Sequence, residues 1–145
     1  MPAADRIHDV VKNALVKDGW SITADPFTIE YEEINVYADL AADRILAAER
    51  GVEKIAVEIK SFIGRSRVHD LEVTLGQYNL YQSLLEIVAP DRKLYLAVGE
   101  SIYAEFFEQK AVQMILRRFQ VSLIVVKLES EEIIAWISRP DTGRS

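Results

Sequence analysis

The segment IAVEIKS, residues 55–61, places a glutamate and a lysine two positions apart in a stretch that otherwise has the composition of a buried strand. Side chains alternate across a strand, so Glu58 and Lys60 share one face while Ile55, Val57 and Ile59 share the other. A half-exposed strand with a charged outer face would explain this pattern. A functional site that uses both charges would explain it as well.

Two neighbouring motifs favour the site. Asp39 interrupts the strand-like VYADLAA, and an aspartate is disfavoured in a strand unless something binds it. Gln77 and Tyr81 in GQYNLY are four residues apart, so they share one face of a helix. An aspartate, then E-x-K, then Q-x-x-x-Y in this order is much less expected by chance than any one of the three.

The elements that must position these residues follow from hydrophobic periodicity and turn signals. The order is α-β-β-β-α-β-α-β-β, which predicts an α/β domain with a central mixed sheet flanked by helices. Residues 1–138 form one domain, and residues 139–145 are predicted to be a flexible tail. The expected helices are 3–18, 68–89 and 101–119; the expected strands are 20–31, 34–40, a hairpin of 45–49 with 54–62, then 93–98, 121–128 and 132–137.

Composition excludes several classes of site and of protein. The 145 residues include no cysteine and two histidines, which removes disulfides, thiolate zinc sites and cysteine nucleophiles. The net charge of −6 argues against nonspecific coating of nucleic acid. No export signal and no apolar stretch of membrane-spanning length is present, so we expect a cytoplasmic protein without a membrane partner.

At this point the motifs resemble a known family. Asp39 followed by E-x-K is similar to the PD-(D/E)XK nuclease superfamily, and the Q-x-x-x-Y helix resembles its RecB-type branch. Over nearly the whole chain the sequence resembles the XisH family, named for a factor that controls excision of the fdxN DNA element in cyanobacteria. The blocks that carry this resemblance are HDVVKNALVKDGW, DLAADRILAAERG, KIAVEIKSF, LGQYNLY and RKLYLAV.

The resemblance implies a restriction-endonuclease-like core and assigns roles to the motif residues. Asp39 and Glu58, with the backbone carbonyl of Ile59, would hold Mg²⁺ or Mn²⁺, and Lys60 would lie beside the attacking water. Gln77 would contact the site or the nucleic-acid backbone, with Tyr81 supporting it. Oxygen ligands of this kind are those that Mg²⁺ prefers.

Two details depart from this pattern. Ala38 stands where the superfamily name has proline, and counting outward from a tight turn at Gly51 does not place Asp39 opposite Glu58 without a bulge. Asp43 or Glu49 therefore remains an alternative second ligand. Two arginines in the loop before the second helix, Arg65 and Arg67, are possible DNA contacts.

Gly76, within a helix, is expected to mark the close approach of another segment.

Two functions stay open. One is a metal-dependent, endonuclease-like factor that hydrolyses DNA phosphodiester bonds during programmed excision. The other is a catalytically silent regulatory subunit that binds DNA or protein on the same fold. The resemblance implies DNA and an XisI-like protein as partners, and a homodimer would suit cleavage of two strands.

Overall fold

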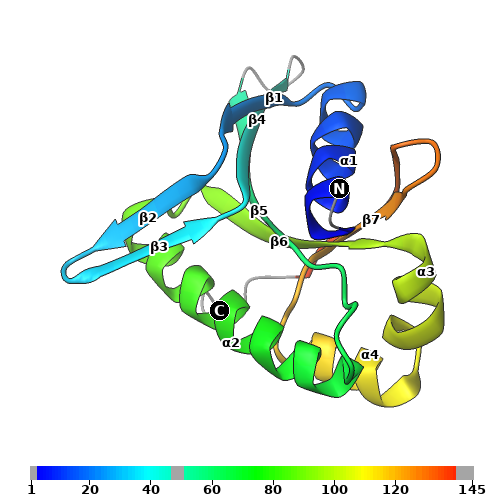
Figure 1. The fold of residues 1–145 in the computed structure, drawn as a ribbon. Helices are drawn as coiled ribbons and strands as arrows, with labels where there is room; N and C mark the ends of the chain where they lie inside the picture. Colours follow the sequence, from blue (N-terminus) through cyan, green and yellow to red (C-terminus); the bar gives the residue numbers. More distant parts are fainter. Residues whose placement is uncertain (1–2, 47–50, 140–145) are drawn as a thin grey trace.

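The computed structural model describes residues 3–46 and 51–139, which form a mixed α/β domain (Figure 1). The helices are α1 (Ala3–Lys17), α2 (Arg67–Val88), α3 (Glu100–Ile102), a π-helical turn (Tyr103–Phe107) and α4 (Lys110–Arg118). The strands are β1 (Ser21–Ala24), β2 (Phe27–Tyr31), β3 (Ile34–Ala38), β4 (Leu40–Leu46), β5 (Gly51–Ile59), β6 (Arg92–Gly99), β7 (Leu123–Lys127) and β8 (Glu132–Ile137).

The central sheet has the strand order β1-β4-β5-β6-β7-β8. Strands β5, β6 and β7 are mutually parallel, whereas β1, β4 and β8 join antiparallel. The parallel pairs need crossovers, which α2 supplies between β5 and β6, and the α3–α4 segment between β6 and β7. The predicted mixed sheet flanked by helices is confirmed.

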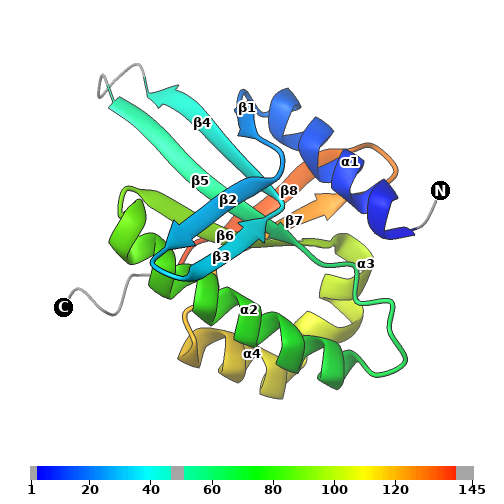
Figure 2. The same cartoon turned by 60° about the vertical axis from the view of Figure 1, so that its left-hand side comes forward.

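The sheet separates two apolar cores. Ile55, Val57 and Ile59 pack with α1 residues such as Val11 and Leu15 on one face. Ala56, from the other face of β5, belongs to the core that α2 and the α3–α4 segment cover. Figure 2 shows α1 and α2 on opposite sides of the sheet. The predicted alternation is therefore correct, and it directs Glu58 and Lys60 towards the α2 side.

Strands β2 and β3 form a separate two-stranded hairpin that lies over α2 and projects beyond it (Figures 1 and 2). Its inner face contributes Ile29, 1% exposed, and Ala38 to the core on that side. The chain then passes from the hairpin into the central sheet at a single residue, because β3 ends at Ala38 and β4 begins at Leu40. That residue is Asp39.

Two predicted element boundaries were wrong. Five strands lie between α1 and α2, where the predicted order has three and the expected ranges number four. The range 20–31 is divided into β1 and β2, and the range 34–40 ends before Asp39, so that β4 begins at Leu40 and not at Ile45. The single helix expected at 101–119 is interrupted after Phe107, where Gln109 is extended with ψ 142°. The side chain of Gln113 donates to the Phe107 carbonyl at 2.6 Å, so a side chain satisfies that carbonyl group at the break.

The end of the described chain is attached to the domain. Arg139, the first residue of the predicted tail, donates its N–H to Ser122 Oγ at 3.0 Å and accepts from Lys93 Nζ at 3.0 Å through its carbonyl oxygen. Residues 140–145 lie outside the described part of the chain. Within that part, no helix has the length and apolar character needed to cross a bilayer.

Candidate functional site

The strand register brings Asp39 beside Glu58. Leu40 pairs with Val57 and Leu46 with Gly51, and one further step along the same ladder matches Asp39 to Glu58 without a bulge. The prediction from the turn was therefore wrong. It assumed a tight turn at Arg50-Gly51, whereas the last pair of the ladder is Leu46 with Gly51, which moves the register of every pair in the hairpin.

Asp39 is fixed by the backbone of the strand that carries Glu58. Its Oδ2 accepts the Ile59 N–H at 2.7 Å. The next N–H along the chain, that of Lys60, donates to the Ala97 carbonyl of β6 at 3.1 Å. The end of β5 is thus tied to β6 on one side and to the Asp39 carboxylate on the other, which gives the three motif residues fixed relative positions.

Glu58 is a buried acid in an electrostatically unfavourable place. Only 6% of the residue is exposed, and Lys60 Nζ lies 3.4 Å from its Oε2. Burial and then the adjacent negative charge of Asp39 raise the pKa of Glu58 from 4.5 to about 7, against the opposing effect of Lys60. Its second oxygen, Oε1, is buried without a hydrogen-bond partner among the described residues.

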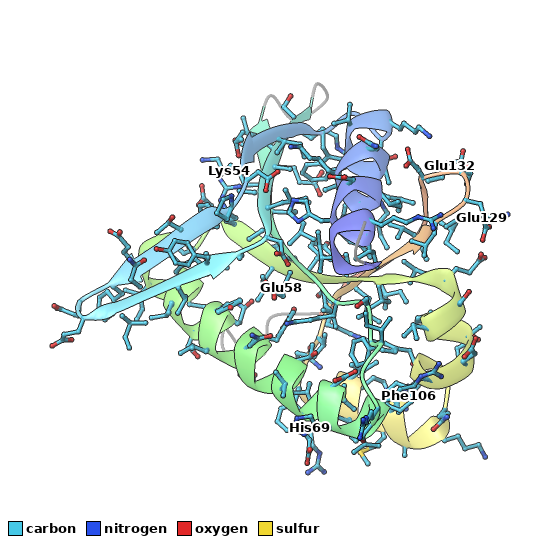
Figure 3. The ribbon with its side chains drawn as sticks, viewed as in Figure 1. Lys54, Glu58, His69, Phe106, Glu129 and Glu132 are labelled. Atoms are coloured by element: carbon cyan, nitrogen blue, oxygen red, sulfur yellow. The ribbon has the colours of Figure 1, made fainter. Side chains whose placement is uncertain are left out.

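Helix α2 covers this charged face (Figure 3). Tyr81 is buried, and burial followed by the nearby charges of Glu58 and Asp39 raises the pKa of its phenol. Gln77 lies one turn earlier on α2, and its Oε1 is buried without a hydrogen-bond partner in the described chain. The helix face that carries the Q-x-x-x-Y motif therefore places Tyr81 near Asp39 and Glu58. One helical turn away, the same face carries the Gln77 oxygen, which has no hydrogen-bond partner among the described residues.

This donor set fits a hard divalent cation. Two neighbouring carboxylates repel each other, and a buried carboxylate oxygen without a donor is costly unless a cation or water satisfies it. The residues described include no cluster of three or more histidine, aspartate or glutamate side chains. Mg²⁺ commonly takes only one or two carboxylates and fills its other positions with water and phosphate oxygens, so this pair suffices.

The alternative acids are not part of this arrangement. Asp43 pairs with Lys54 across the hairpin, at the other end of the charged face from Glu58, and its carboxylate binds Arg92 at 3.0 Å. Figure 3 shows the separation of Lys54 from Glu58 along β5. Glu49 lies outside the described residues.

The two loop arginines differ in their surroundings. Arg65 is exposed and makes no ion pair with any described residue, whereas Arg67 binds Glu105 at 2.9 Å. A role of Arg67 in binding phosphate would require it to leave that carboxylate. Gly76 is exposed, and a Cβ at this position would meet nothing within 4 Å, so the expected close approach of another segment was wrong.

One contact beside the site was not expected from the sequence. Asp70 Oδ2 accepts the Gly64 N–H at 3.0 Å and thereby holds the loop after Lys60 against the first turn of α2. A Cβ at Gly64 would lie 2.7 Å from Asp70 Oδ1, so any other residue here would have to displace this carboxylate. The sequence signal for this contact is a glycine, Gly64, six residues before an acid in the first turn of the helix.

Comparisons with known proteins agree with the resemblance. The XisH protein family model matches residues 1–134. The crystal structure of an XisH family protein from Nostoc punctiforme PCC 73102 is 40% identical, with a TM-score of 0.84, covering 92% of this chain and all of that one. That of a fdxN element excision controlling factor protein from Anabaena variabilis is 41% identical, also with a TM-score of 0.84, covering 92% of this chain and 99% of that one.

The comparison with curated proteins finds no match. The family model nevertheless spans most of the chain, and both solved structures are similar over almost their whole length. The chain belongs to the XisH family.

Proposed function

We propose that this protein is a Mg²⁺-dependent, restriction-endonuclease-like factor that hydrolyses DNA phosphodiester bonds in the excision of a DNA element. The observation that carries the proposal is the buried Glu58, held beside Asp39 and Lys60 with one carboxylate oxygen unpaired among the described residues. A fold gains no stability from such a group, so its presence indicates a ligand or a reaction.

Each side chain has a role that its position supports. Asp39 and Glu58 hold the cation, with the carbonyl of Ile59 as the backbone ligand. Bound Mg²⁺ or Mn²⁺ would polarise the phosphodiester and acidify a water molecule. Lys60 orients that water or stabilises the charge that develops on the phosphate. Tyr81 and Gln77 line the site from α2, and Gln77 offers its unpaired amide oxygen to a water or to the DNA backbone.

The role in excision comes from the Anabaena variabilis relative, a fdxN element excision controlling factor protein. A cytoplasmic location, where the DNA lies, belongs to the same proposal.

The test is cleavage of plasmid and of single-stranded DNA with Mg²⁺ or Mn²⁺, by the wild-type protein and by Glu58→Gln and Lys60→Met. We expect cleavage that EDTA abolishes and that each substitution lowers by at least about 10²-fold, the scale of a lost electrostatic or acid–base contribution. Asp43→Asn is the matched control, because Asp43 belongs to the Arg92 pair outside the site. Equal cleavage by the two site variants and the wild type would reject the proposal.

A second candidate is a regulatory subunit that acts by binding another protein. The observation that favours it is the β2–β3 hairpin, where Tyr31 and Ile34 pair next to the turn and are 40% and 44% exposed. Tyr37, 53% exposed, lies near the base of the hairpin on its other face. Glu32 and Glu33 lie between the first two in the sequence and add negative charge. Exposed aromatic and aliphatic side chains near acids suit a partner with an apolar patch rimmed by basic residues. An XisI-like protein and a second copy of this chain are the two occupants to test.

Tyr31→Ser with Ile34→Ser would separate these occupants. Loss of co-purification with the XisI-like protein, with the oligomeric state unchanged in sedimentation, would identify a heterologous partner. A shift to monomer would identify a homodimer. Unchanged behaviour in both assays would remove the hairpin from any interface.

A further inference from the structure

A cavity of about 230 Å³ opens directly beside Lys60. One wall is the chain that leaves β5, from Lys60 to Gly64, and the other is the first two turns of α2. Lys60 thus belongs both to this cavity and to the acid pair, because its Nζ is 3.4 Å from Glu58 Oε2. The cavity therefore adjoins the acid pair through Lys60.

The cavity is bounded by a fixed loop. Phe62 has a φ of 54°, which is uncommon for a bulky side chain, and its buried ring packs edge-on against Phe107 at 5.0 Å between centroids. Two residues later the Gly64 N–H is held by Asp70. These anchors hold the loop on both sides of Ile63, whose side chain is exposed and lines the cavity. The space therefore has a defined shape.

The lining combines apolar walls with hydrogen-bonding groups. Phe62, Ile63 and Val73 supply the apolar surface, while Thr74, Ser61 and Asp70 supply hydroxyl and carboxylate groups. The Lys60 ammonium and the His69 imidazole also line the cavity. The Asp70 carboxylate holds the Gly64 N–H through Oδ2, and its other oxygen can accept a hydrogen bond from the exocyclic amino group of a base. The volume equals that of about eight water molecules, the scale of one heterocyclic ring system, not of a whole nucleotide.

We propose that this cavity binds a nucleobase turned out of the stack, that of the nucleotide next to the phosphate at Glu58. The inference rests on the proposed function, because it takes DNA as the substrate. It narrows the substrate to DNA in which that base is unpaired or easily unpaired, since unstacking costs least there. The apolar walls contact the faces of the base, and Asp70 and Thr74 meet its edge.

Photocrosslinking tests this without requiring hydrolysis. The probe is a short single-stranded oligodeoxynucleotide with one 5-iodouracil, irradiated with the full-length protein in Ca²⁺ and in EDTA, and the crosslinked peptides are identified by mass spectrometry. We expect crosslinks within residues 61–74. Val73→Trp, which fills the cavity from an exposed position on α2, should lower their yield about tenfold, the loss expected when one base can no longer bind.

Val16→Trp is the matched control, because Val16 is also an exposed helical valine but lies on α1, across the sheet. It should leave the yield unchanged, and thermal melting should show that both variants fold. Crosslinks confined to other residues, or an equal yield from Val73→Trp, would overturn the proposal. Crosslinks at residues 61–74 without any DNA cleavage would reject the nuclease function but support the base-binding cavity. DNA cleavage without these crosslinks would support the nuclease function and reject the base-binding cavity.

Discussion

Glu58 occupies a position where an aliphatic side chain would make a more stable protein. Its neighbours along the buried strand are Val57 and Ile59, and the nearest acid is Asp39. Because the pKa of Glu58 rises to about 7 in the folded chain, the folded protein binds more protons than the unfolded chain between pH 4.5 and 7. The free energy of unfolding must therefore fall as the pH rises through this window.

Replacing Glu58 by glutamine should remove this loss. Glutamine keeps the shape and the hydrogen-bonding oxygen but carries no charge, so we expect Glu58→Gln to be more stable than the wild type at pH 8 by up to roughly 3 kcal/mol. The advantage should shrink towards pH 4, where the wild-type carboxyl is protonated in both states. Urea denaturation in EDTA at both pH values measures the difference.

The control for this experiment is Glu132→Gln, at an exposed position on β8. Its effect should be small and independent of pH. If Glu58→Gln has the same effect on unfolding at pH 4 and pH 8, the carboxyl group is not electrostatically strained and the account of the acid pair is wrong.

Alanine substitutions at two glycines, Gly64 before α2 and Gly76 within it, should change the stability of the protein in opposite directions. Gly76 is exposed within the helix and has open space around the position of a Cβ, so Gly76→Ala should stabilise the protein by about 1 kcal/mol. Gly64→Ala should destabilise it, because the added Cβ would lie 2.7 Å from the Asp70 carboxylate. Thermal melting of the two variants gives the signs directly, and a gain in both would contradict the fixed position of the loop.

The hydroxyl of Tyr78 connects α2 to the sheet. It donates to the Leu94 carbonyl of β6 at 3.0 Å and accepts the Ser122 N–H, just before β7, at 3.0 Å. Tyr78→Phe would leave both buried backbone groups without this partner, at a cost of about 1–3 kcal/mol in the free energy of unfolding. The exposed Tyr37→Phe, measured by the same urea titration, should change it by less than about 0.5 kcal/mol.

Much of the element order could be predicted from local signals. The helix expected at 68–89 begins at Arg67 because Ser66 caps it, its Oγ accepting the His69 N–H, and the strand expected at 132–137 is β8. The faces of β5 followed from alternation alone. The family resemblance implied that Asp39, Glu58, Lys60 and Tyr81 share one site, with Asp43 or Glu49 as alternatives to Asp39, and the fold brings these four side chains together.

The remaining features depend on contacts that are distant in sequence. Whether Asp39 or Asp43 faces Glu58 is decided by the length of the β4–β5 connection, and a local turn signal at Arg50-Gly51 does not determine that length. At the break in the helix after Phe107, the carbonyl group is bound by the Gln113 side chain, six residues away. The sequence shows Asp39 as an interruption within the expected strand 34–40, but not that it joins the β2–β3 hairpin to the central sheet.

At the scale of the whole molecule, the site joins parts that the sequence keeps far apart. Asp39 lies where the β2–β3 hairpin meets the central sheet, Glu58 and Lys60 lie near the end of β5, and Tyr81 lies on α2. A cation between these groups would bind the folded chain and not the unfolded one, in which the ligands are dispersed. Metal binding should therefore raise the free energy of unfolding of the whole domain.

We expect Mg²⁺ or Mn²⁺ to raise the melting temperature of the wild-type protein. At a free concentration about ten times the dissociation constant, the gain is about 1.4 kcal/mol, or roughly 3–6 °C for a domain of this size. The shift should grow above pH 7, because Glu58 must lose its proton to bind the metal. Asp39→Asn should abolish most of the shift, whereas Asp43→Asn should retain it, since Asp43 binds Arg92 away from the site. Differential scanning calorimetry with and without the cation measures these shifts. An equal shift in both variants would place the metal elsewhere. No shift in the wild type at millimolar Mg²⁺ or Mn²⁺ would leave the acid pair without a cation and favour the regulatory subunit.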